Sequence, residues 1–161
     1  MTIKVLFVCL GNICRSPAAE GVFKHIVSIN GLEGRIHVDS AGTGGWHVGE
    51  MADTRMRTAA TKRGFKLNSI GRQITKGDFK NFHYIIAMDE NNYADCLALR
   101  PANVVAQINR MKDYIHSHSI SGIPDPYYGG EQGFEEVLDL LEEGCLNLLN
   151  EIQRINEVNG E

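Results

Sequence analysis

The sequence has little cysteine and no long hydrophobic run. Its four cysteines, Cys9, Cys14, Cys96 and Cys145, are few for 161 residues and form no Cys-x-x-Cys pair, so we expect neither a disulfide scaffold nor a zinc ribbon. No stretch approaches the ~20 apolar residues of a membrane span, and the apolar run near the start is too short for a secretory segment. We therefore expect a cytoplasmic protein with reduced thiols and no membrane association.

The chain also lacks an overall excess of positive charge. Its 16 Lys+Arg and 20 Asp+Glu give a formal net charge of −4, which argues against general nucleic-acid affinity. The two signs are unevenly spread, because residues 1–80 contain 12 Lys+Arg against 6 Asp+Glu, whereas residues 81–161 contain 4 against 14. A site in the first half would therefore lie in a positive local field despite the acidic total.

Signatures of nucleotide and metal sites are missing as well. No Gly-Lys-Ser/Thr occurs, which excludes a Walker loop, and residues 42–44 (Gly-Thr-Gly) begin like a dinucleotide loop but are followed at the sixth position by His47 instead of glycine. His116 and His118 share one face of an extended segment, but no third ligand lies nearby. We therefore predict no cofactor and no metal.

The chain does contain an alternation of strand and helix patterns. Strands are predicted at Val5–Val8, Ile36–Ala41, Tyr84–Met88 and Val104–Ile108, and helices at Ser16 to about Asn30, Asp53–Arg63, from the cap Asp89 to about Leu99, and Phe134–Ile155. Residues 112–124 have the polar composition of a loop. This order predicts one α/β domain, residues 1–161, with a parallel sheet covered by helices on both faces. Ligands of such sheets bind at the carboxyl ends of the strands.

The first strand and first helix are joined by the run Cys9-Leu10-Gly11-Asn12-Ile13-Cys14-Arg15-Ser16. Ser16-Pro17 indicates a helix start, with the hydroxyl as the cap and proline at the first helical position. The loop N–H groups would then gather at a helix N-terminus, an arrangement suited to an anion. Gly11 and Asn12 tolerate the positive φ that such a curled loop demands.

Two side chains give this loop a candidate chemistry. Cys9, at the end of the strand, would face backbone N–H groups and a helix N-terminus, and both favour the thiolate over the thiol. Arg15 supplies a planar fork of donors that matches two phosphate oxygens, and the Ser16 hydroxyl would donate to the Cys9 sulfur. The alternative is that Cys9 is only a small apolar residue, but its neighbours favour a nucleophile.

A thiolate that attacks a phosphate monoester needs an acid to protonate the departing oxygen, and such an acid contributes ~10²–10⁴-fold. Asp125 is the best candidate because Pro126 fixes it and Tyr127 and Tyr128 follow. An Asp-Pro pair is also common in ordinary turns, and that alternative stays open at this point.

These segments together resemble the low-molecular-weight protein tyrosine phosphatases. The likeness rests on Cys9-Leu10-Gly11-Asn12-Ile13-Cys14-Arg15-Ser16-Pro17 and Asp125-Pro126-Tyr127-Tyr128, with Asp39-Ser40-Ala41-Gly42, Trp46, Arg72-Gln73-Ile74 and Met88-Asp89-Glu90 in order between them. It covers essentially the whole chain. It implies a four-stranded parallel sheet with helices on both sides, and metal-free hydrolysis of phosphotyrosine through a phosphocysteine.

The resemblance also implies roles for the residues of the site. Cys9 is expected to be the nucleophile, Arg15 the phosphate clamp, and Asp125 the acid for the phenol and then the base for water. Asn12 and Ser16 are expected to organise the loop. Residues 9–16 as a whole, including Gly11 and Cys14, would hold inorganic phosphate or similar oxyanions. Phosphotyrosine proteins would be the partners of a monomeric enzyme.

Further residues are expected to select the substrate. By resemblance, Leu10, Trp46, Tyr127 and Tyr128 wall a cleft that is deep enough for phosphotyrosine and too deep for phosphoserine. The similar bacterial arginine phosphatases carry threonine where this chain has Ile13, so isoleucine favours phosphotyrosine.

One departure and one redox hypothesis accompany the resemblance. Many relatives carry a histidine three residues before the arginine that matches Arg72, where it supports the loop asparagine, and this chain has Ser69 there. In relatives the thiol that matches Cys14 can form a reversible disulfide with the nucleophile, and we expect the same of Cys14 and Cys9. The alternative is that Cys14 only packs.

Two other functions compete with this interpretation. An arsenate reductase shares the fold and loop but needs a relay of further cysteines, for which this chain offers only Cys96 and Cys145. A non-catalytic phosphotyrosine-binding module should lack the nucleophile or the acid, and both are present.

Overall fold

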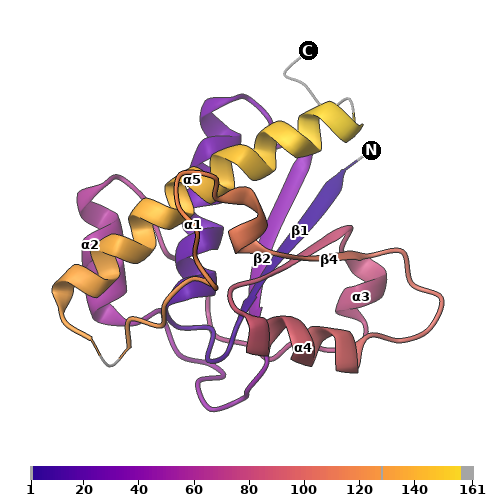
Figure 1. Ribbon diagram of the computed structural model, residues 1–161, viewed down its shortest axis with the longest axis horizontal. Coiled ribbons are helices and arrows are strands. Elements are labelled where there is room, and N and C mark those ends of the chain that lie inside the picture. The colour runs from indigo at the N-terminus through magenta and orange to yellow at the C-terminus, as the bar shows by residue number, and fades with distance from the viewer. Residues whose placement is uncertain (1, 128, 157–161) are drawn as a thin grey trace.

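Four parallel strands form the centre of the computed structural model, which describes residues 2–127 and 129–156 (Figure 1). The strands are β1 (Ile3–Cys9), β2 (Ile36–Gly42), β3 (Tyr84–Ala87) and β4 (Gln107–Arg110), in the spatial order β2-β1-β3-β4. β1 pairs on both sides, with Val5 opposite Val38 of β2 and Tyr84 of β3. The predicted four-stranded parallel sheet is confirmed.

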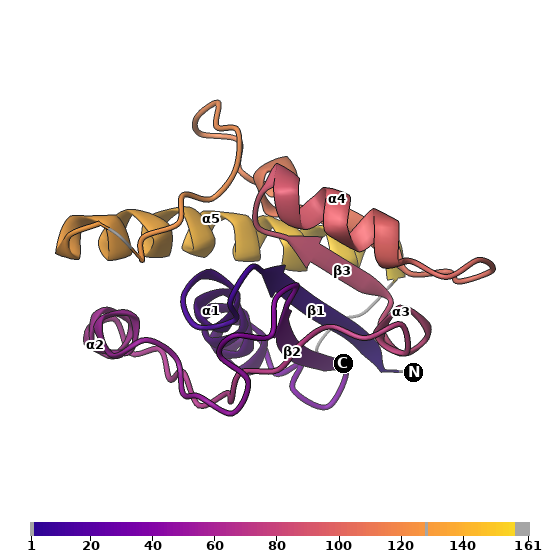
Figure 2. The same cartoon turned by 90° about the horizontal axis from the view of Figure 1, so that it is seen from below.

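Helices cover both faces of this sheet (Figure 2). α1 (Arg15–Ile29), α2 (Thr54–Lys62) and α5 (Glu131–Asn156) lie on one face, and α3 (Asp78–Asn81) and α4 (Glu90–Leu99) lie on the other. Successive side chains of a strand point to opposite faces of the sheet, so β1 contributes to a hydrophobic core on each face. Val5 and Phe7 lie in the first core, and Leu6 and Val8 lie in the second. The larger core is the one beneath α1 and α5.

The start of α1 differs from the predicted one. α1 begins at Arg15, its N-cap is Cys14, and no side chain caps it. Ser16 is not the cap, because its hydroxyl lies 2.9 Å from the Cys9 sulfur instead. Pro17 is the third helical residue, where its missing N–H still costs no intrahelical hydrogen bond.

Other boundaries follow from local contacts. The carboxylate of Asp89 caps α4 as expected, accepting from the Asn92 N–H at 2.8 Å. The prediction of a strand at residues 104–108 was early by about three residues, because Val105 is 91% exposed and the pairing with β3 begins only at Gln107. The single turns α3 and η1 (Met111–Tyr114) were not predicted, since elements this short carry no periodic pattern.

The longest helix, α5, is 26 residues and amphipathic, with its apolar stripe in the core. Within the described parts of the chain, none of the helices has both the length and the apolar character that crossing a bilayer requires. The carboxyl ends of β1 and β3 lie side by side, and the loop of Cys9 begins there. The sheet therefore places the loop where α/β folds bind their ligands.

Candidate active site

The loop between β1 and α1 curls around the sulfur of Cys9. Asn12 has φ 57°, and its backbone N–H donates to Cys9 Sγ at 3.3 Å. The positive φ predicted at Asn12 is confirmed, whereas Gly11 does not have one. At Gly11 the ring of His47 lies close instead, because an added Cβ would be 3.1 Å from it. His47 therefore packs closely over the loop at Gly11.

A second hydrogen bond reaches the sulfur from Ser16. Ser16 is fully buried, its Oγ lies 2.9 Å from Cys9 Sγ, and it accepts from Asn12 Nδ2 at 2.8 Å. Because Asn12 donates to this hydroxyl, the single hydroxyl hydrogen is left for an acceptor, and the Cys9 sulfur at 2.9 Å is closer than the Ala41 carbonyl at 3.4 Å. Cys9 itself is 3% exposed, so two donors converge on a buried sulfur.

The asparagine is held by groups from three other parts of the chain. Asn12 Nδ2 also donates to Ser40 Oγ at 3.0 Å, and Ser40 donates to the buried carboxylate of Glu20 at 2.6 Å. On its other side, Asn12 Oδ1 accepts from the backbone N–H of Arg72 at 3.0 Å. These contacts hold the asparagine, and Ser69 is not among its hydrogen-bond partners.

The backbone of Arg72 is fixed in turn by its own side chain. The guanidinium donates to Asp39 at 3.1 and 3.2 Å and to Asp78 at 3.0 and 3.1 Å. Although burial opposes the charge, the hydrogen bonds that Arg72 donates to Asp78 and the charge of Asp39 raise the pKa of Arg72. The segment that supports the loop is therefore tied to β2 and α3.

Arg15 is 3% exposed and is oriented by two groups beyond the ends of the neighbouring strands. Its Nη1 donates to Asp89 at 2.6 Å and to the Ile123 carbonyl at 3.0 Å. Nη2 faces the carboxylate of Asp125 at 3.7 Å. Nη1 of the guanidinium is thus hydrogen-bonded within the protein, and Nη2 faces the pocket.

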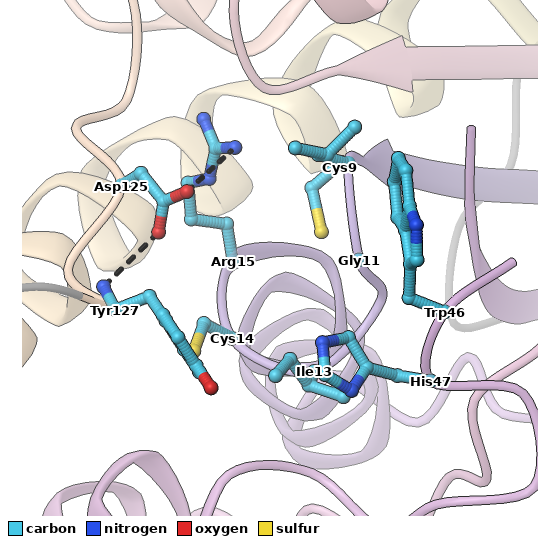
Figure 3. Close-up of a pocket in the computed structure, with 10 residues that line it drawn as sticks. Cys9, Gly11, Ile13, Cys14, Arg15, Trp46, His47, Asp125 and Tyr127 are labelled. Carbon is cyan, nitrogen blue, oxygen red and sulfur yellow. Dashed lines mark hydrogen bonds and ion pairs between the residues drawn. The ribbon is translucent and has the colours of Figure 1, made fainter. Parts of the chain in front are cut away.

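Asp125 lies across the pocket from Cys9 (Figure 3). Its Oδ1 accepts from the backbone N–H of Tyr127 at 3.0 Å, and its Oδ2 is the atom that faces Arg15. The side chain is 41% exposed. The tight turn gives the carboxylate a fixed direction while leaving Oδ2 open to the pocket.

The pocket itself has a volume of about 380 Å³. The predicted residues Leu10, Ile13, Trp46 and Tyr127 line it together with His47, which was not predicted. In Figure 3 the sulfur of Cys9 points into the pocket, with Trp46 on one side and Tyr127 on the opposite side. Trp46 is 72% exposed, so it forms a projecting rim. Tyr128, also predicted, lies outside the described residues.

The Tyr127 wall is held by the first turn of α2. Arg55 lies over the Tyr127 ring, 5.4 Å from its centroid, and donates to the Tyr127 carbonyl at 3.0 Å. Asp53 caps α2 and holds the guanidinium, and the hydrogen bond from Arg55 lowers the pKa of Asp53. The Asp53 N–H also donates to the Ile13 carbonyl at 2.8 Å, so one helix start supports both the loop and the wall.

Comparisons with known proteins agree with this geometry. The family model for low molecular weight phosphotyrosine protein phosphatases matches residues 4–158. The chain belongs to that family. The low molecular weight protein-tyrosine-phosphatase YfkJ of Bacillus subtilis is 42% identical over 94% of this chain and 97% of its own length.

Solved structures of the family superpose over nearly the whole chain. A protein tyrosine phosphatase from Entamoeba histolytica has a TM-score of 0.93 at 45% identity, covering 96% of this chain and 99% of that one. The Drosophila protein described as an arginine phosphatase has a TM-score of 0.87 at 36% identity, covering 94% and 98%.

The candidate site includes residues that sequence reasoning missed or assigned otherwise. Asp89 was expected as a helix cap, and Asp89 and Ser40 were quoted in segments that carry the resemblance, but neither was given a role at the loop. Glu20 was not singled out at all, because no local pattern links it to the loop. His47 could have been suspected from its place beside Trp46 in a glycine-rich segment. Within residues 2–127 and 129–156, no group of three or more His, Cys, Asp or Glu side chains is placed to hold a metal ion.

Cys14 lines the same pocket as Cys9 and is 4% exposed. Burial, together with the charges of Asp53, Cys9 and Asp125, raises the pKa of the Cys14 thiol to about 12. Cys14 is therefore a buried, neutral thiol in the pocket that Cys9 also lines.

Proposed function

We propose that this protein hydrolyses phosphotyrosine, with Cys9 as the nucleophile, Arg15 as the phosphate ligand and Asp125 as the general acid and base. The observation that carries the proposal is the buried Cys9 sulfur, which receives hydrogen bonds from Ser16 and the Asn12 backbone at the floor of a pocket that Asp125 enters from the rim. Two donors on one sulfur stabilise its negative charge.

In the first step, the Cys9 thiolate attacks phosphorus, a P–S bond forms, and the P–O bond to the tyrosyl oxygen breaks. Asp125 gives its proton to the departing phenolate oxygen from Oδ2, the carboxyl oxygen that no backbone group holds. The phosphate oxygens meet the loop N–H groups and Nη2 of Arg15, whose Nη1 stays bound to Asp89.

In the second step, a water molecule attacks the phosphocysteine. The Asp125 carboxylate takes a proton from that water as the P–O bond forms, the P–S bond breaks, and inorganic phosphate and the Cys9 thiolate are released. The Ser16 hydroxyl stabilises the thiolate as a leaving group through the same 2.9 Å contact that stabilises it as the attacker. The cycle is balanced without an external acid or base other than water.

The walls of the pocket support an aromatic substrate. Leu10, Trp46 and Tyr127 provide apolar surface on either side of the Cys9 sulfur, and a tyrosyl ring would pack between them. We further propose that phosphotyrosine proteins are the substrates, that inorganic phosphate competes for the loop, and that the enzyme is a monomeric single domain in the cytoplasm. Tyr128 stays a predicted part of the wall.

Hydrolysis of p-nitrophenyl phosphate in the presence of EDTA tests the chemistry. Wild type should turn over, Cys9→Ser should be inactive, and Asp125→Ala should lose part of its kcat because p-nitrophenol is a good leaving group. With a phosphotyrosine peptide the Asp125→Ala loss should be larger, within the ~10²–10⁴-fold range of general acid catalysis. An inactive wild type, or an active Cys9→Ser, would refute the proposal.

The same variants distinguish the competing functions. A binding module would retain phosphopeptide without turnover in wild type. An arsenate reductase would need a thiol relay, but Cys96 and Cys145 are both fully buried, and burial raises the pKa of Cys96 to about 12 and that of Cys145 further. Neither lines the pocket of Cys9.

The phosphoryl acceptor needs a separate test, since one structural relative is described as an arginine phosphatase. Ile13 lines the pocket and is 8% exposed, so its side chain would contact the phosphorylated side chain that enters the pocket. We expect wild type to prefer a phosphotyrosine peptide over the matched phosphoarginine peptide, and Ile13→Thr to weaken that preference. If Ile13→Thr keeps the wild-type ratio of kcat/KM for the phosphotyrosine peptide to kcat/KM for the phosphoarginine peptide, Ile13 does not select the substrate.

A further inference from the structure

A second hollow lies directly beside the proposed catalytic pocket. It has a volume of about 480 Å³, and its lining includes Leu10, Trp46, Gln73, and Asp95 and Leu99 of α4. We call it the α4 hollow. It is separate from the catalytic pocket, because neither Cys9 nor Arg15 lines it.

The two cavities share a wall. Leu10 and Trp46 line both of them, and these side chains are 43% and 72% exposed. The shared wall is therefore a projecting partition with a cavity on each face. A peptide whose phosphotyrosine occupies the catalytic pocket must cross the rim, and an extended chain advances only about 3.5 Å per residue. Residues close to the phosphotyrosine can therefore reach the α4 hollow over this partition.

The carboxylate of Asp95 gives the α4 hollow a negative charge. Asp95 is exposed on α4, and among the residues that the structure describes none forms an ion pair with it. The carboxylate that lines the catalytic pocket already has a cationic partner, since Asp125 faces Arg15 at 3.7 Å. Asp95 is thus a carboxylate that a ligand's cation can pair with at no cost to an existing pair.

The other lining residues suit a side chain that is apolar along its length and charged at its tip. Lysine and arginine lay their methylene groups on apolar surface and keep the charge at an accessible end. Leu10 and Leu99 provide apolar surface, Trp46 offers an aromatic face to a cation, and Asp95 supplies the opposite charge. An acidic residue in the same place would meet the like charge of Asp95.

We propose that the α4 hollow is a substrate subsite, and that it selects phosphotyrosine sequences with a lysine or arginine close to the phosphotyrosine. This inference rests on the proposed function and adds a specificity residue, Asp95, to it. Asp95 acts on the choice of substrate, whereas Cys9, Arg15 and Asp125 act on the phosphate.

Pairs of phosphotyrosine peptides test the proposal. Each pair differs only in carrying lysine or glutamate at one position, scanned over about three residues on either side of the phosphotyrosine. In wild type, the lysine peptide should have a kcat/KM about two- to fivefold higher at one or more positions, as expected for an exposed ion pair. The preference should shrink in high salt because the pair is open to solvent.

Variants of Asp95 test whether this residue causes the preference for lysine peptides. Asp95→Asn should bring the lysine-to-glutamate ratio close to one, and Asp95→Lys should invert it. The matched control is Glu33→Gln, which changes net charge equally but lies just before β2, at the opposite end of the sheet from the pocket. This control should keep the wild-type ratio, because each ratio is measured within one protein.

The outcomes separate the subsite from the reaction. A wild type that hydrolyses p-nitrophenyl phosphate and phosphopeptides without a lysine preference, or an Asp95→Asn variant that keeps the preference, overturns the subsite and leaves the proposed function intact. A wild type that hydrolyses neither substrate overturns both.

Discussion

Replacement of Asp89 tests whether the orientation of Arg15 limits the reaction. The carboxylate has two functions, since Oδ1 accepts from the Asn92 N–H at the start of α4 and Oδ2 accepts from Arg15 at 2.6 Å. Asp89→Asn keeps a good helix cap and removes the charge that faces Arg15. Asp89→Ala removes both. The two variants therefore separate the cap from the ion pair.

The expected losses of activity and stability follow from the burial of Arg15 and Asp89. Arg15 has a side chain that is 4% exposed, whereas that of Asp89 is 29% exposed. A hydrogen bond to a charged group contributes about 1.5–3 kcal/mol, and we take about 1.5 kcal/mol because water reaches Asp89. Loss of a cap costs a further ~1 kcal/mol. Since ~1.4 kcal/mol is a factor of ten, we expect kcat/KM to fall about tenfold in both variants, and only Asp89→Ala to lose the additional stability.

The assays are kcat/KM for p-nitrophenyl phosphate and the free energy of unfolding in urea. If Asp89→Asn keeps kcat/KM within about twofold of wild type, the Ile123 carbonyl and the surrounding core orient Arg15 without help. If activity instead falls further in Asp89→Ala than in Asp89→Asn, in step with stability, the start of α4 and not the ion pair limits the reaction.

Three further predictions concern the loop, the core and the acid range. Peroxide inactivation should be reversed by thiols in wild type but not in Cys14→Ser, because Cys14 is the buried thiol beside the nucleophile; equal recovery would contradict this. Gly21→Ala should lower the free energy of unfolding by about 1–2 kcal/mol in a urea titration, since the new Cβ would lie 2.8 Å from the backbone carbonyl of Lys66 and overpacking outweighs the helix propensity gained. Hydrogen bonds from Ser117 and nearby backbone lower the pKa of Glu143, so its stabilisation is present above about pH 4.3 and is lost as the pH falls through the lowered pKa. Glu143→Gln should therefore destabilise the protein near neutral pH and not in strong acid, and equal destabilisation at both would exclude this role.

Much of the site could be predicted from the sequence because its central part is local. Cys9, Asn12, Arg15 and Ser16 lie within one strand-to-helix connection, and a buried strand followed by a helix places them at one end of a parallel sheet. Asp125 was predicted from the chemistry that a thiolate requires, and the fold brings it to the same pocket. The strands and the amphipathic α5 followed from hydrophobic periodicity.

Predictions that depended on exact backbone geometry were less successful. Ser16 was expected both to cap α1 and to donate to the Cys9 sulfur; its hydroxyl lies 2.9 Å from that sulfur, and it does not cap the helix. Gly11 was expected to have a positive φ, but it does not, and the ring of His47 lies close to it instead. At Ser16 the predicted partner was right and the predicted cap was wrong, whereas the neighbour of Gly11, His47, is one that no local pattern contains.

By itself, the sequence determined the loop, the order of strands and helices, and the pairing of a cysteine with an arginine that defines the family. Only the tertiary structure decided which distant groups hold these residues: the backbone of Arg72 and the Glu20 carboxylate for the loop, and Asp89 for Arg15. The α4 hollow with Asp95 also exists only in the fold. The physical reason is that sheet order, not spacing along the chain, determines which strand ends and helix starts become neighbours.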